Sequence, residues 1–137
     1  MNLIRVQLHS EKSTTPEFVF PMAMGYEIFS AEAKIIEAGK TDLVDTGLSI
    51  IVPQGSYAQI ISRPSLASIG VNAGAPLFRP GSNIYLKIVL SNQGSNHLAI
   101  FEGDKIATLV VLPTDPPLIV QSPDEDAPPP YNEVCQK

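Results

Sequence analysis

The chain has 137 residues, of which 44% are hydrophobic and 17% charged, so it can bury the core of one domain. Its net charge of −5 and isoelectric point near 4.9 disfavour a general attraction to nucleic acid or to an anionic membrane. The single cysteine, Cys135, excludes an intrachain disulfide, and His9 and His97 stand alone, so no zinc site is expected.

The chain shows no long apolar segment. Residues 1–5 lack the apolar core of a signal peptide, and no run approaches the ~20 apolar residues that a membrane helix needs. The cysteine usage fits a reducing compartment. We therefore expect an intracellular protein, cytoplasmic or nuclear, without a membrane span.

Short runs of high β-propensity follow one another from the start of the chain to about residue 112, separated by turn residues such as those at 53–56 and 92–96. The expected strands are 3–8, 35–36, 48–52, 57–61, 84–90, 98–101 and 106–112. One short helix is expected near 65–70. Many short strands between turn signals predict an all-β fold, a sandwich or a barrel.

The composition changes at about residue 113. Prolines recur between residues 114 and 137, with the acidic run 124–126 among them. Such a segment cannot build a sheet ladder or bury a core, so we expect it to be extended and flexible. The sequence thus predicts a β domain over residues 1–113 and an acidic, proline-rich tail over 114–137, in which the apolar residues 118–120 would form a sticky patch or a swapped strand.

Five phrases, in the correct order, resemble the motifs of the deoxyuridine triphosphatase (dUTPase) family, which is related to the dCTP deaminases. They span roughly residues 20–112 and lie at 24–31, 46–57, 63–67, 70–74 and 103–109. The resemblance implies a distorted β-barrel or jelly roll of the β-clip type, a homotrimer with shared active sites, and Mg²⁺-assisted hydrolysis of dUTP to dUMP and pyrophosphate.

The third motif departs from the family at its general base, an aspartate that acts on the attacking water. Leu77 stands at that position, or Arg79 if two residues are inserted. No Asp or Glu occurs between Asp45 and Glu102, and neither leucine nor arginine can accept the proton. Loss of a general base typically lowers a rate by a factor of ~10² to 10⁴.

The other motifs are altered as well. Pro64 stands at the place of a phosphate-binding serine, with Ser65 one position late, and proline also removes a backbone N–H donor. Thr108 replaces a glutamine, and Glu27 replaces an aspartate. No glycine follows residue 113, so the glycine-rich fifth motif is absent. These departures predict that no catalytic residue and no metal ligand remain, and hence a pseudoenzyme without a cofactor; Mg²⁺ is expected only if the chain hydrolyses dUTP.

A remnant nucleotide pocket would consist of the motif residues that keep their chemistry: Glu27, Arg63, Ser65, Asn72 and Gly74. In that pocket Asn72 would bind a uracil-like base and Arg63 a phosphate. The alternatives are a structural role for Asn72 in a turn, and an exposed or subunit-interface position for Arg63.

The tail contains Pro-Pro-x-Tyr, with Pro128, Pro129 and Tyr131 in the defining places. Prolines pre-set a polyproline II helix, which WW domains bind, and such motifs recruit HECT-type ubiquitin ligases. A tetrapeptide arising by chance in a proline-rich tail is the alternative, and Tyr131 could also be a phosphotyrosine docking site.

The leading interpretation is therefore a non-enzymatic, dUTPase-like interaction module, viral or virus-derived, that recruits WW-domain host proteins through its tail. Two alternatives stay open. One is a divergent dUTP diphosphatase that uses an unrecognised base, and the other is a sensor that binds deoxyuridine nucleotides without turnover.

Overall fold

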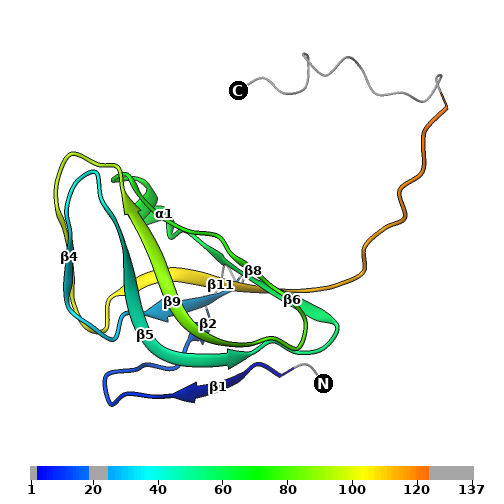
Figure 1. Cartoon of the computed structure of the whole chain (residues 1–137), viewed down its shortest axis with the longest axis horizontal. Helices are drawn as coiled ribbons and strands as arrows, with labels where there is room; N and C mark the ends of the chain where they lie inside the picture. Colours follow the sequence, from blue (N-terminus) through cyan, green and yellow to red (C-terminus); the bar gives the residue numbers. More distant parts are fainter. Residues whose placement is uncertain (1–2, 19–24, 124–137) are drawn as a thin grey trace.

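The computed structural model describes residues 3–18 and 25–123 (Figure 1). The secondary structure within these ranges is almost entirely strand. The elements are β1 (Arg5–Leu8), β2 (Glu17–Phe18), β3 (Tyr26–Phe29), β4 (Lys34–Ile36), β5 (Thr41–Ile51), β6 (Ser56–Ile61), α1 (Pro64–Ala67), β7 (Val71–Ala73), β8 (Leu77–Phe78), β9 (Asn83–Asn92), β10 (Leu98–Ile100) and β11 (Lys105–Pro113).

The strands form three antiparallel sheets, which we name by size. The four-stranded sheet has the order β1-β5-β9-β7, the five-stranded sheet the order β2-β3-β11-β6-β8, and the third pairs β10 with β4. Neighbours in each sheet are often far apart in sequence, as the jelly-roll class requires. The all-β, jelly-roll prediction is confirmed. Among the described residues, no helix has the length and hydropathy to span a bilayer.

The core lies between the sheets and follows the period of two that a half-buried strand requires. On β6, Ser56, Ala58 and Ile60 are buried while the residues between them are partly exposed. On β9, Leu86, Ile88 and Leu90 are buried in the same alternation. Aliphatic side chains of this size each stabilise the fold by roughly 1.5–3 kcal/mol when fully buried, so these two strands anchor the two large sheets to one another.

Strand β5 is longer than the predicted 48–52 because it continues through an irregularity. Its register against β9 shifts between Asp45 and Leu48, where Gly47 has a φ of 64°. The hydroxyl of the fully buried Thr46 donates to the carbonyl of Leu86 at 2.6 Å and accepts from the N–H of Leu48 at 3.2 Å. One side chain therefore satisfies two backbone groups that the interrupted ladder leaves without partners.

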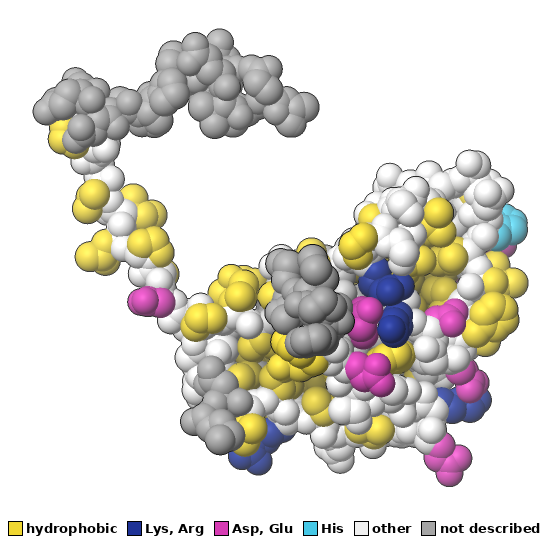
Figure 2. All heavy atoms as spheres, turned by 180° about the vertical axis from the view of Figure 1, so that it is seen from behind, with side chains coloured by type: hydrophobic (Ala, Val, Ile, Leu, Met, Phe, Trp, Pro, Cys, Tyr) yellow, Lys and Arg dark blue, Asp and Glu magenta, His cyan; other side chains and the backbone are white. Residues whose placement is uncertain are grey.

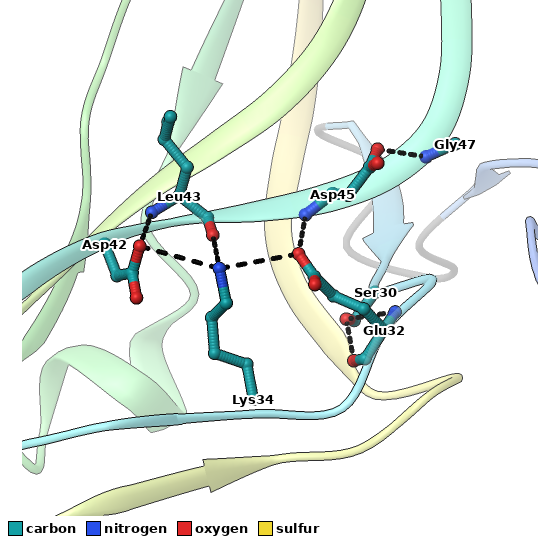
Figure 3. A network of polar contacts seen from close by, with 7 residues as sticks. All are labelled: Ser30, Glu32, Lys34, Asp42, Leu43, Asp45 and Gly47. Carbon is teal, nitrogen blue, oxygen red and sulfur yellow. Dashed lines mark hydrogen bonds and ion pairs between the residues drawn. The ribbon is translucent and has the colours of Figure 1, made fainter.

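A polar network joins β4 to the first half of β5 (Figure 3). The ammonium of Lys34 donates to the carbonyl of Leu43 at 2.6 Å and lies 3.5 Å from Asp42 and 3.7 Å from Glu32. Glu32 in turn accepts from the N–H of Asp45 at 2.7 Å. The ion pairs are partly exposed, so this network fixes the position of β4 more than it stabilises the fold.

Two glycines bring the turn after α1 against the turn after β9. Gly70 has a φ of 89°, and a Cβ added there would lie 2.7 Å from the nitrogen of Gly94. A Cβ on Gly94 would in turn collide with the carbonyl oxygen of Ile69. The N–H of Gln93 donates to the carbonyl of Gly70 at 2.8 Å, which requires this close approach.

Several elements differ from the sequence-based expectations. Strands β2, β3, β7 and β8 were not predicted, and the helix begins at Pro64 and ends at Ala67, earlier than the expected 65–70. After β11 ends at Pro113, residues 114–123 form neither helix nor strand and lead away from the body (Figures 1 and 2). The side chains of Leu118, Ile119 and Val120 are exposed there. Pro128, Pro129 and Tyr131 lie outside the described residues.

Candidate functional site

A nearly buried carboxylate, that of Glu27, lies at the centre of the candidate site. Glu27 belongs to β3 and is the direct cross-strand partner of Thr108 on β11. Its side chain is only 12% exposed. A charged group so far from water needs partners of opposite charge, and two cations provide them.

The first cation is Arg63, which the local sequence places between β6 and α1. Pro64 occupies the first position of the helix, and the residue before a proline is restricted to extended backbone, so Arg63 has φ −77° and ψ 134°. Its Nε lies 3.3 Å and its Nη2 3.5 Å from the two carboxylate oxygens of Glu27. Its Nη1 donates to the hydroxyl of Ser65 at 3.0 Å.

The second cation, Lys105, stands at the start of β11. Its ammonium lies 3.9 Å from Oε2 of Glu27. Thr108, on the same strand, donates its hydroxyl to Oε1 of Glu27 at 3.4 Å. Glu27, Arg63, Ser65, Lys105 and Thr108 therefore form one cluster, which we call the Glu27 cluster and which carries one more positive than negative formal charge.

A cavity of about 250 Å³ lies beside the Glu27 cluster, between α1, β10 and the start of β11. Arg63 and Lys105 line it together with Asp104, and the rest of its wall is mainly aliphatic. Pockets that enclose whole drug-sized ligands measure roughly 300–1,000 Å³. The cavity is thus suited to the anionic part of a ligand, held by two cations.

The other two predicted pocket residues, Asn72 and Gly74, lie at β7 in the four-stranded sheet. Asn72 is exposed and pairs with Ser91, and the N–H of Gly74 donates to the carbonyl of Val89 at 2.8 Å. The hydroxyl of Ser62 accepts from the N–H of Ala73 at 2.9 Å. This hydrogen bond connects the Glu27 cluster to β7, because Ser62 precedes Arg63 in the sequence and Ala73 follows Asn72.

Two charged residues of this region were not found from the sequence. Lys105 is one, and the other is Glu17, the direct cross-strand partner of Glu27 on β2. Directly opposed residues point to the same face of a sheet, so Glu17 brings a second carboxylate to this face. By contrast, both residues aligned with the family's base are exposed, Leu77 on β8 and Arg79 after it, and neither can accept a proton.

The described residues contain no group of three or more His, Cys, Asp or Glu side chains that could hold a metal ion. Glu27 itself does not fit a Mg²⁺ ligand, because Arg63 and Lys105 already lie within 4 Å of its oxygens and would repel a dication. Mg²⁺ usually keeps several waters and binds through substrate phosphates with one or two carboxylates. The donor set therefore supports no protein-held Mg²⁺ at this cluster.

The family model described as dUTPase matches residues 11–127 of the chain. The chain belongs to the dUTPase family. A relative from Candida albicans, named deoxyuridine 5′-triphosphate nucleotidohydrolase, is 38% identical over 109 residues, which are 79% of this chain and 69% of that protein. A tomato protein of the same name is 36% identical over 125 residues, covering 90% of this chain and 73% of its own.

Solved dUTPase structures show the same fold. An aspartate-to-asparagine variant of the dUTPase of phage phi11 of Staphylococcus aureus superposes with a TM-score of 0.76 at 24% identity, covering 92% of this chain and all of that one. The dUTPase of Staphylococcus bacteriophage 80alpha, solved with dUpNHpp, gives 0.77 at 21% identity, over 96% of this chain and 94% of that one. The phi11 structure is described as showing a structural Mg(II) ion.

The interpretation of the chain as a non-enzymatic, WW-binding pseudoenzyme is contradicted by these relatives. They are named as nucleotidohydrolases and match most of the chain at 32–38% identity. These comparisons do not show a viral origin of the chain. The comparison of single motif positions missed that the site gathers side chains from three places, namely β3, β11 and the β6–α1 turn.

Proposed function

We propose that this protein hydrolyses dUTP to dUMP and pyrophosphate. The observation that carries the proposal is the Glu27 cluster, which unites the chain's counterparts of the first, second and fourth family motifs around one cationic cavity. The names of the relatives, deoxyuridine 5′-triphosphate nucleotidohydrolase, give the substrate.

Arg63 and Lys105 would bind the triphosphate. Arginine presents a planar fork of donors that suits phosphate oxygens, whereas lysine contributes a compact point charge. Both side chains line the same cavity and are partly exposed, so an incoming phosphate can reach them. Held in this way, they stabilise the negative charge that develops on the leaving pyrophosphate.

The base would be recognised at β7. This strand is an edge of the four-stranded sheet, and the exposed amide of Asn72 has both a donor and an acceptor that match the edge of uracil. Gly74 lets β7 pack closely on β9, because a Cβ there would lie 3.2 Å from the side chain of Val89.

The proposed homotrimer and the proposed Mg²⁺ ion rest on the resemblance to the dUTPase family. A homotrimer would complete each site with elements of a neighbouring subunit, and Mg²⁺ would arrive bound to the triphosphate. The remaining features of the proposal come from the sequence: a β domain over 1–113, a separate tail over 114–137, and a reducing cytoplasmic or nuclear location compatible with one cysteine.

Pyrophosphate release from dUTP with Mg²⁺ tests the proposal, with dCTP and dTTP as competing substrates and heat-treated protein as the control. We expect turnover of dUTP above that of the other two. Binding of the analogue dUpNHpp without any turnover of dUTP would replace the proposed activity with nucleotide sensing. The absence of both would reject it altogether.

A further inference from the structure

The proposed hydrolysis needs a group that takes a proton from the attacking water, and no carboxylate stands at the usual motif position. We infer that Glu27 is the general base of this protein. The inference rests on the proposed function and adds the residue that performs its central step.

Two other carboxylates close to the cluster have partners of their own. Asp104 accepts from the N–H of Phe101 at 2.8 Å, which caps the turn before β11. Glu102 pairs with Lys12 at 2.9 Å. Glu27 is the carboxylate that contacts Arg63, and thus the one that would stand beside a phosphate held by Arg63.

The contacts of Glu27 are unusually long for a charged group. Charge-assisted N–H···O bonds are typically about 2.7–2.9 Å. The distances from the Glu27 oxygens are 3.3 and 3.5 Å to Arg63, 3.4 Å to Thr108 and 3.9 Å to Lys105. A nearly buried carboxylate that is surrounded by donors but held closely by none can accept one further partner, and a water molecule is the natural one.

Substrate binding would change the balance of charge around Glu27. The charged groups that face it are Arg63 from the β6–α1 turn, Lys105 from β11 and Glu17 from β2. A triphosphate competes for the two cations, since its oxygens carry more charge than one carboxylate. Arg63 and Lys105 would then contact the phosphates, and the oxygens of Glu27 would be open to a water molecule.

The step can be written atom by atom. The water oxygen forms a bond to the phosphorus of the α-phosphoryl group, and one water proton passes to a carboxylate oxygen of Glu27. The bond from that phosphorus to the oxygen that bridges to the β-phosphoryl group breaks, and its electron pair leaves on pyrophosphate. Glu27 then returns the proton to solvent, so no atom is oxidised or reduced.

The test compares Glu27→Gln with Glu17→Gln in the full-length protein. Both variants remove one negative charge from the same row of the same sheet, but only the first removes the inferred base. We expect kcat of the wild type to fall at acidic pH, and we expect Glu27→Gln to lower kcat for dUTP by a factor of ~10² to 10⁴ and to lack that fall. Binding of dUpNHpp, measured by calorimetry, should change less than about tenfold, because removing the base leaves both cations in place. Glu17→Gln should keep kcat within about tenfold of the wild type.

The outcomes separate the two proposals. Wild-type turnover with an equally active Glu27→Gln variant would reject the role of Glu27 and leave the proposed function standing. A wild type that releases no pyrophosphate from dUTP would reject both. If Glu27→Gln fails to fold by circular dichroism, Glu27→Asp decides, because it keeps the carboxylate. Its kcat should fall at acidic pH as that of the wild type does, and a flat profile in both proteins would overturn the inference.

Discussion

Replacement of Thr46 by valine should destabilise the protein substantially although it changes almost nothing in shape. The hydroxyl of Thr46 has no exposure to solvent and makes two hydrogen bonds, one to the carbonyl of Leu86 and one from the N–H of Leu48. Valine keeps the β-branched form and the strand propensity, so the change isolates the hydroxyl.

The magnitude follows from the number of bonds. Each neutral hydrogen bond contributes about 1 kcal/mol net, and a buried group left without a partner costs about 1–3 kcal/mol. The loss of two bonds at the register shift of β5 should therefore lower the free energy of unfolding by about 2–3 kcal/mol. Thr41 offers a matched control on the same strand, because its hydroxyl bonds to Ser91 at an exposed position.

Urea unfolding followed by circular dichroism measures both variants. Thr41→Val should stay within about 0.5 kcal/mol of the wild type, as exposed substitutions do. A difference in the free energy of unfolding between the two variants of less than about 1 kcal/mol would show that the backbone groups at the register shift find other hydrogen-bond partners. Thr46 would then have no special part in stabilising β5.

Three further predictions concern charge. Arg63→Lys keeps the charge but removes the planar fork, so kcat/KM for dUTP should fall about 10- to 100-fold, as one charge-assisted bond of about 1.5–3 kcal/mol is lost; an unchanged value would exclude Arg63 from the phosphate site. Tyr85 is 47% exposed, but partial desolvation, and after it the carboxylate of Asp45, raises the pKa of its hydroxyl. The folded state thus holds this proton more tightly, and stability should decline as pH rises through the raised pKa. Asp45→Asn should lower the pKa of Tyr85, measured by tyrosinate absorbance with Tyr85→Phe to assign the signal, and no difference between the titrations would refute this coupling. Lys34→Met should lower the free energy of unfolding by about 1 kcal/mol or less, and by less still at high salt, because the ion pairs of Lys34 are partly exposed. A much larger decrease in urea unfolding would show that the network is a principal source of stability.

The fold class could be predicted because long strands such as β9 alternate buried and exposed residues over ten positions. The short strands could not, since β2 and β8 contain two residues each and carry no period of their own. The first half of β5 was missed for another reason. Asp42 and Asp45 interrupt its apolar pattern, and only the network with Lys34 and Glu32 shows why they belong in a strand.

The candidate site was predicted in part. Glu27, Arg63 and Ser65 were chosen from three short motifs, and they lie together in the structure. Asn72 lies in another sheet, which the Ser62–Ala73 hydrogen bond connects to the Glu27 cluster. The order of residues in the sequence does not reveal this separation. Glu17 could not be found, because its place opposite Glu27 depends on the register of a two-residue strand.

The reciprocal contact of Gly70 and Gly94 has a consequence for how this protein can vary. A Cβ on Gly70 would collide with the backbone of Gly94, and a Cβ on Gly94 would collide with the carbonyl oxygen of Ile69. Neither position can therefore accept alanine while the other turn stays in place. A substitution at either glycine should therefore prevent the two turns from packing. A second substitution at the partner glycine cannot compensate for it, because glycine has no side chain that could be made smaller. In a saturation-mutagenesis library selected for folded protein, these two positions should tolerate the fewest replacements outside the core, although both belong to surface turns that would ordinarily be among the most permissive.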